Sequence, residues 1–97
     1  MRLCVKKDTS VLKRAQREVP GVGVITYVLY EEKGLRNEPT EYGIEIDKRS
    51  PNGGESRRIS SITADRFFAS RLFRALILGE VTPCTLEDVV LDFLSEV

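Results

Sequence analysis

Hydrophobic and polar residues alternate most regularly over residues 40–48. Tyr42, Ile44 and Ile46 fall on one face of an extended chain, whereas Glu41 and Glu45 fall on the other. An alternation with a period of two is typical of a strand that buries one face and exposes the other. Residues 40–48 are therefore predicted to be a half-buried antiparallel strand.

Residues 22–32 form a second predicted strand, in which both faces carry apolar side chains. Val24 and Val28 share one face with Tyr30, while Ile25 and Leu29 share the other. Apolar groups on both faces indicate a strand that is covered on both sides. The glycine, proline and charged residues at 33–39 predict an exposed loop.

Residues 55–61 are the third predicted strand, joined to 40–48 by a tight turn. The Asn52-Gly53 pair favours a type I′ hairpin turn, because both residues tolerate positive φ angles. A turn centred there places Ile46 opposite Ile59 and Asp47 opposite Arg58, which matches apolar with apolar and acid with base.

Two helices are predicted after the strands. The first covers residues 64–78, with Thr63 as its N-cap and Gly79 as its stop. The second covers residues 86–96, with Thr85 as its N-cap. Phe93 and Leu94 are expected to reach the core, because they recur at helical spacing with other apolar residues; those are Leu86, Val89, Val90 and Val97. The predicted fold class is α+β, a three-stranded antiparallel meander followed by two packed α-helices.

The first twenty residues allow two interpretations. Val11, Leu12, Ala15 and Val19 recur at helical spacing before Pro20, but the apolar stripe is thin. Residues 1–20 are therefore predicted to be a basic segment that is either a short helix or a mobile arm. Residues 21–97 are predicted to be one α+β domain.

Composition and charge narrow the classes of function. The 97 residues carry 15 bases and 15 acids, and this zero net charge argues against a nucleic-acid or anionic-membrane protein. The charges lie in blocks: residues 1–20 and 49–74 are basic, whereas residues 21–48 and 75–97 are acidic. No apolar stretch is long enough to span a bilayer, and no signal peptide is apparent, so a cytoplasmic protein is expected.

Catalytic chemistry finds little support in the sequence. The chain has no histidine, which excludes a Ser-His-Asp triad and a Cys-His site within it. Cys4 and Cys84 are too few for a thiolate metal site, and each is expected to behave as a small buried hydrophobe. We therefore expect no catalytic residues, no cofactor and no metal, and hence a protein that is not an enzyme.

Three segments of the second half form a recognisable pattern, which are Tyr42-Gly43-Ile44-Glu45-Ile46, residues 59–62 and residues 81–90. Through these segments, about residues 40–94 resemble a family of small proteins of unknown function from clostridial and related Gram-positive bacteria. Cys84-Thr85 stand where the family has Ile-His, so no role of that histidine carries over. The resemblance implies a bacterial, cytoplasmic protein and no particular activity.

The first predicted helix carries the candidate interaction surface. Phe67 and Leu78 project about 20° apart on its polar side, among Arg66, Arg71 and Arg74. Either a neighbouring element covers the two apolar residues, or they form an interface, where aromatic and arginine residues are enriched.

The interface interpretation predicts a homodimer. In this arrangement Phe67 and Leu78 contact a second copy, oriented by arginines against its Glu87, Asp88 and Asp92. Another protein partner is the other occupant considered.

The alternative function is nucleic-acid binding. It would use Arg57, Arg58, Arg66, Arg71 and Arg74, with Tyr27, Tyr30 and Tyr42 as stacking groups. Zero net charge and the acidic C-terminal helix oppose it.

Overall fold

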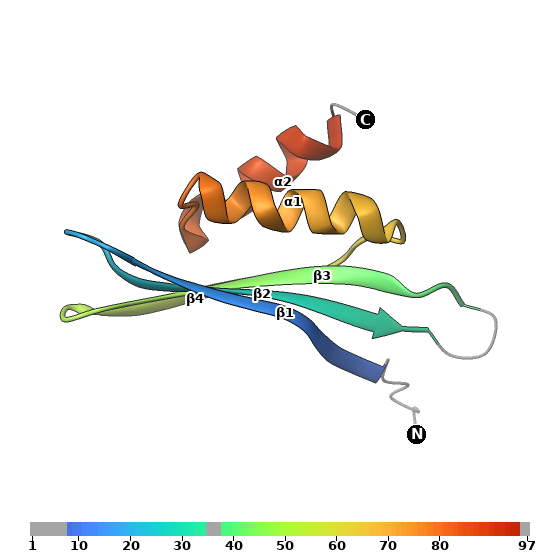
Figure 1. Cartoon of the computed structure of the whole chain (residues 1–97), viewed down its shortest axis with the longest axis horizontal. Helices are drawn as coiled ribbons and strands as arrows, with labels where there is room; N and C mark the ends of the chain where they lie inside the picture. Colours follow the sequence, from blue (N-terminus) through green and yellow to red (C-terminus); the bar gives the residue numbers. More distant parts are fainter. Residues whose placement is uncertain (1–7, 35–37, 96–97) are drawn as a thin grey trace, which may run out of the picture.

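The computed structural model describes residues 8–34 and 38–95, which form an antiparallel sheet with helices on one side (Figure 1). The strands are β1 (Asp8–Val19), β2 (Gly23–Lys33), β3 (Glu41–Ser50) and β4 (Gly53–Thr63), in the sheet order β1-β2-β3-β4. The helices are α1 (Arg66–Leu78), the short 3-10 helix η1 (Pro83–Thr85) and α2 (Leu86–Ser95). The described part of the chain is thus an α+β meander with its helices after its strands.

The prediction of three strands is wrong, because residues 8–19 are neither a helix nor an arm but strand β1. β1 pairs with β2 along its whole length, from Asp8 opposite Lys33 to Val19 opposite Gly23. The spacing of four between Ala15 and Val19 suits a helical turn and equally suits two steps of a strand, since four is a multiple of the strand period. Both side chains pack against the core from the sheet.

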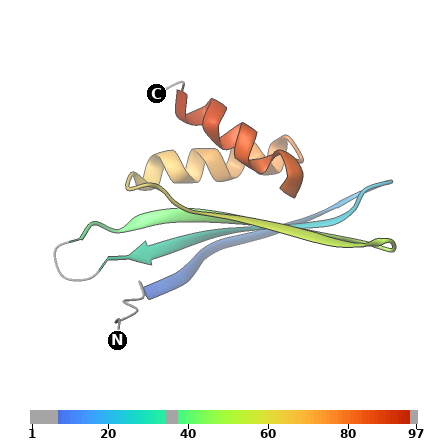
Figure 2. The ribbon, with the colours of Figure 1, turned by 180° about the vertical axis from the view of Figure 1, so that it is seen from behind.

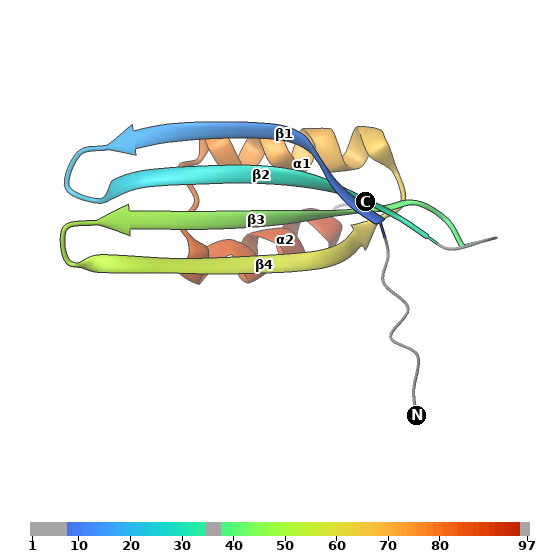
Figure 3. The same ribbon diagram turned by 90° about the horizontal axis from the view of Figure 1, so that it is seen from below.

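The hydrophobic core lies between the sheet and α1. Figure 2 shows α1 and α2 on the same face of the sheet, opposite to the face seen in Figure 3. The strands contribute the buried side chains of Ile25, Tyr27, Leu29, Tyr42, Ile44 and Ile46. The helices contribute Phe68, Ala69, Leu72, Phe73, Leu76, Leu86 and Val90. The two central strands, β2 and β3, bury alternate side chains, and each α-helix buries one stripe, as the two periodicities predict.

The expectation that β2 is covered on both sides is met on one side only. Val24, Thr26, Val28 and Tyr30 face away from the helices and are half-buried among side chains of the neighbouring strands. We call this helix-free side of the sheet the open face (Figure 3).

The register of the β3–β4 hairpin differs by two residues from the prediction. The turn residues are Pro51 and Asn52, with Ser50 opposite Gly53 and Ile44 opposite Ile59. Proline fixes φ near −65°, which suits the second position of an ordinary β-turn and excludes Pro51 from a strand continuing to an Asn-Gly turn. A shift of two keeps every side chain on its predicted face.

In the predicted register Lys48 would lie opposite Arg57, which is a like-charge pair. In the observed register Lys48 lies opposite Glu55 instead, and its Nζ is 3.2 Å from the Glu55 carboxylate. Arg58 lies opposite Glu45 on the open face.

The helix ends follow local capping chemistry. Asp65, not Thr63, is the N-cap of α1, and its carboxylate accepts hydrogen bonds from the N–H groups of Phe67 (2.9 Å) and Phe68 (3.2 Å). Gly79 ends α1 as predicted, donating to the carbonyl of Ala75. Thr85 does not cap α2 but lies in η1, where its hydroxyl donates to the carbonyl of Thr82.

The predictions for α2 are confirmed in part. Phe93 packs against the core, and its ring lies 5.1 Å from the ring of Phe68 between centroids. Leu94 is exposed instead, because it lies on the border of the buried stripe that Leu86 and Val90 define.

The Tyr42-Gly43-Ile44-Glu45 segment has a distinct structural role at each position. Tyr42 and Ile44 are core residues. Gly43 lies beneath the Glu32 side chain, and an added Cβ there would be 3.2 Å from a Glu32 carboxylate oxygen and 2.8 Å from the carbonyl oxygen of Ile59. The absent side chain at Gly43 therefore leaves room for Glu32 to cross β3.

Glu32 uses this room to link β2 to β4. Its side chain is 5% exposed and accepts a hydrogen bond from the N–H of Ser61 at 2.8 Å. The Arg58 guanidinium lies 3.8 Å from its second oxygen. Ser61 has a φ of 54°, so the carboxylate holds a residue in a left-handed conformation at the end of the sheet.

Candidate interaction surface

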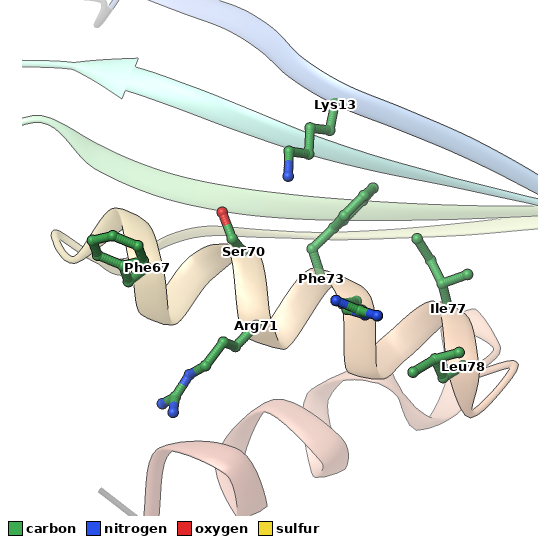
Figure 4. Close-up of a pocket in the computed structure, with 8 residues that line it drawn as sticks. Lys13, Phe67, Ser70, Arg71, Phe73, Ile77 and Leu78 are labelled. Carbon is green, nitrogen blue, oxygen red and sulfur yellow. The ribbon is translucent and has the colours of Figure 1, made fainter.

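The α1 helix forms one wall of a groove of about 380 Å³ at the β1 side of the sheet. The groove is lined by Lys13, Phe67, Ser70, Arg71, Phe73, Arg74, Ile77 and Leu78 (Figure 4). Ser70, Phe73 and Ile77 point toward the sheet, and Lys13 extends from β1 toward them. Phe73 is buried and Ile77 half-buried, so the groove has an apolar floor.

The two apolar residues singled out from the sequence stand at opposite ends of this groove. Phe67 is 84% exposed and Leu78 is 69% exposed. Eleven residues separate them, which is three helical turns and about 16 Å along the axis. Of the two alternatives, covering by a neighbouring element does not hold among the described residues, since both side chains are open to solvent.

Of the predicted basic residues, Arg71 and Arg74 line the groove, whereas Arg66 is exposed outside its lining. The Arg71 guanidinium lies 5.8 Å from the ring of Phe68 and 5.9 Å from that of Phe93, and so rests over the contact between α1 and α2. Figure 4 shows it extending toward α2. Contact of the guanidinium with two rings orients the charge, and the residue remains exposed.

The groove carries a single sign of charge. Lys13, Arg71 and Arg74 are its charged groups, and none of the lining residues that the structure describes is acidic. Lys13 was missed as a site residue, because residues 1–20 were assigned to a separate segment. Pairing of β1 with β2 is what brings Lys13 beside α1, and only the strand periodicity of residues 13–19 could have indicated it.

The residues of the nucleic-acid alternative do not form one surface. Tyr27 and Tyr42 are core residues, so they are not available for stacking on bases. Arg57 lies opposite Ile46, on the helix-covered side, whereas Arg58 lies on the open face. Of the three tyrosines only Tyr30 lies on the open face, where the Arg58 guanidinium stacks 4.3 Å from its ring centre.

Both described tyrosines of β2 have altered acidity. Tyr27 donates its hydroxyl hydrogen to the carbonyl of Val81 at 3.0 Å, and burial raises its pKa above the ordinary value. Tyr30 donates to the carboxylate of Glu45, and this hydrogen bond is the main reason that its pKa is raised. Neither phenol is among the residues that line the groove, so these shifts have no part in its electrostatics.

Metal-ligand and cysteine chemistry add no further site within the described residues. No group of three or more His, Cys, Asp or Glu side chains in residues 8–34 and 38–95 is arranged to hold a metal ion. Cys84 is exposed, contrary to the expectation of a buried thiol, and its sulfur lies 3.4 Å from the Thr82 hydroxyl. Cys4 lies outside the described residues.

The described part of the chain contains no helix with the length and apolar character needed to cross a membrane.

The fold and the groove together define a small α+β protein, a four-stranded meander with two helices on one face and a basic, apolar-rimmed groove along the first of them. The chain belongs to the family of unknown function DUF6514, whose family model matches residues 6–96. This match includes β1 and so extends the resemblance seen over residues 40–94. No curated protein and no solved structure gives a significant match.

Proposed function

We propose that this protein is a non-enzymatic interaction module that binds an acidic amphipathic helix of a partner protein in the α1 groove. The observation that carries this proposal is the placement of Phe67 and Leu78, two strongly exposed apolar residues at the ends of a groove whose only charges are positive. Helix-in-groove recognition uses apolar anchors spaced along one helix face, and acids beside them would pair with Lys13, Arg71 and Arg74.

The length of the groove indicates which helix can occupy it. A helix that contacts both Phe67 and Leu78 needs apolar residues spread over about three turns. The α2 helix of a second copy carries acids around its exposed Leu91 and Leu94, but these two leucines lie within one turn. A second copy, which the sequence analysis favoured, would fill only one end, so we assign the groove to a longer helix of another protein.

A designed peptide tests the proposal. The probe is a helical peptide of four turns with leucines along one face and glutamates beside them, and its matched control has lysines in place of the glutamates. Fluorescence anisotropy should show that the acidic peptide binds and that binding weakens at high ionic strength, because exposed charge pairs are screened by salt. Equal binding of the lysine peptide would contradict the charge complementarity.

Groove variants localise the binding. Leu78→Ala and Arg74→Glu should each weaken peptide binding at least about tenfold, the loss of about 1.4 kcal/mol expected for an anchor residue. Leu91→Ala is the matched control, because Leu91 is 60% exposed on α2 and lies outside the groove. A loss of the same size in Leu91→Ala would overturn the assignment to α1.

The same instrument tests the nucleic-acid alternative. Random single- and double-stranded oligonucleotides should bind weakly, because the arginines lie on different surfaces. Tight binding with a steep salt dependence would favour nucleic acid as the ligand instead.

The cellular setting expected from the sequence is part of the same proposal. A bacterial, cytoplasmic setting, suggested by the resemblance over residues 40–94, stays a prediction.

A further inference from the structure

The open face carries charges in an ordered pattern around an apolar stripe. Val24, Thr26, Val28 and Tyr30 form the stripe along β2, and β1 and β3 flank it. A shallow hollow of about 480 Å³ lies over this face, from Val11 on β1 to Arg49 on β3. The pattern becomes clear when the strands are compared row by row, because directly paired residues share one face of a sheet.

The first row places a base, an apolar residue and an acid side by side. Arg14 of β1 lies opposite Val28 of β2, and Val28 lies opposite Glu45 of β3. Arg14 forms no ion pair with another described residue. The row therefore runs from positive on the β1 side to negative on the β3 side.

A second row, four residues along β2, has the opposite polarity. Glu18 of β1 lies opposite Val24, and Val24 lies opposite Arg49 of β3. Glu18 also forms no ion pair with another described residue. The Arg49 side chain is 77% exposed, so its charge can reach a second acid besides Asp47, with which it pairs at 3.1 Å.

The row between these two also carries side chains that can pair with each other across a two-fold interface. Gln16 lies opposite Thr26, and Thr26 lies opposite Asp47. An amide can donate a hydrogen bond to a carboxylate, so Gln16 and Asp47 are suitable partners if they meet across an interface.

We propose that the open face is the self-association surface of this protein, on which a second copy stacks its own open face about a two-fold axis that runs along β2. Such an axis places β1 of each copy over β3 of the other, at the same level along the strands. Arg14 then faces Glu45 of the second copy, and Glu18 faces its Arg49. Every contact occurs twice, as a two-fold interface requires.

The apolar stripe supplies the contact area between these charges. Val24 and Val28 of the two copies meet at the axis, in the aligned packing of two sheets about 10 Å apart, and the Tyr30 rings beside them carry the Arg58 guanidinium of their own copy. The surface thus matches valine with valine along β2, Arg14 with Glu45 and Glu18 with Arg49, while Asp47 meets the amide of Gln16.

This interface goes beyond the proposed function, because it leaves the groove free. The open face and α1 lie on opposite sides of the sheet (Figure 2). A dimer joined through its open faces would carry two outward grooves, one on each copy. The homodimer predicted from Phe67 is thereby assigned to a different surface.

Charge reversal provides the test, measured by sedimentation over a range of protein concentration. The wild type should dimerise at micromolar concentration. Glu18→Arg and Arg49→Glu should each raise the dimer dissociation constant at least about tenfold, because each turns two symmetry-related attractions into repulsions. The double variant should return close to the wild-type value, because it restores opposite charges across the interface.

The double variant also tests the direction of the axis. A two-fold axis perpendicular to the strands would pair Arg14 with Glu18 and Glu45 with Arg49, and the double variant would then remain impaired. Failure of the double variant to recover therefore overturns the proposed arrangement, as does a wild type that stays monomeric at high micromolar concentration.

Phe67→Glu separates this proposal from the one for the groove. It should leave the dimer dissociation constant unchanged while abolishing binding of the acidic peptide. Loss of dimerisation in Phe67→Glu would move self-association to α1 and contradict the open face. If the wild type dimerises but does not bind the acidic peptide, the result contradicts the proposed function of the groove and leaves the open-face interface standing.

Discussion

The two faces of the sheet are built from the same strands but follow different rules. The helix-covered face is apolar and closed at its centre, where Ile25, Leu29 and Ile46 are at most 1% exposed, and most of its charged residues lie toward the strands at its edges. The open face has an apolar stripe only along β2, and charged residues of β1 and β3 line it. The covered face shows what folding requires of these residues, whereas the order of charges on the open face is the basis of the proposed self-association.

Shortening a core residue should produce the largest effect and define the covered face. Leu72 of α1 is fully buried, and Leu72→Ala should lower the free energy of unfolding by about 2–5 kcal/mol, from lost burial and a cavity. Val28→Ala on the open face should cost clearly less, since Val28 is only half-buried. Urea unfolding at a concentration where the protein is monomeric measures both, and equal losses would remove the distinction between the faces.

A methyl group at Gly43 should have the next largest effect, because it would enter the space in which the Glu32 side chain crosses β3. The added Cβ would lie 2.8 Å from the Ile59 carbonyl oxygen, so the backbone or Glu32 must shift. We expect Gly43→Ala to cost about 1–3 kcal/mol, as overpacking does. Ser60→Ala, an exposed change on β4, is the control and should stay within about 0.5 kcal/mol of the wild type.

The smallest expected effect concerns pH and the open face. The pKa of Tyr30 is raised in the fold, mainly because its hydroxyl donates to Glu45. A raised pKa stabilises the fold below the ordinary tyrosine value of about 10, and this contribution disappears as the pH rises through the folded value. Unfolding measured at mildly and at strongly alkaline pH should therefore show a smaller loss in Tyr30→Phe than in the wild type. An equal loss would mean that ionisation of Tyr30 is not linked to folding.

Sequence periodicity predicted most of the covered face because burial there repeats with the period of each element. Tyr42, Ile44 and Ile46 were assigned to one face, and that assignment survived a two-residue error in register. The Asn52-Gly53 pair by itself predicts a turn at residues 52–53. The fixed φ of Pro51 places the turn one residue earlier, and this difference is the error in register.

The first strand could not be separated from a helix by its spacing. Ala15 and Val19 fit both periods, and the long polar side chain of Arg17 occupies the covered side between them. Arg17 reaches Glu80 at 3.2 Å, beyond the end of α1. A contact across 63 positions leaves no local signal in the sequence.

The sequence predicted only the part of the groove that α1 contributes, because the rest depends on strand pairing. Phe67, Arg71, Arg74 and Leu78 were identified because they share one helix face. Lys13, which completes the groove, comes from a strand whose position depends on pairing with β2. The rows of the open face depend on the register of three strands, and no single segment of sequence carries them.

The meander order also has a consequence for synthesis on the ribosome. Because each strand pairs with the strand that precedes it, the sheet can assemble hairpin by hairpin as the chain emerges. Its apolar face, however, has no cover until α1 has been translated, since both helices follow all the described strands. Until then Ile25, Tyr27 and Leu29 are apolar side chains without their cover, and exposed apolar surface of this kind makes an incomplete chain prone to aggregation.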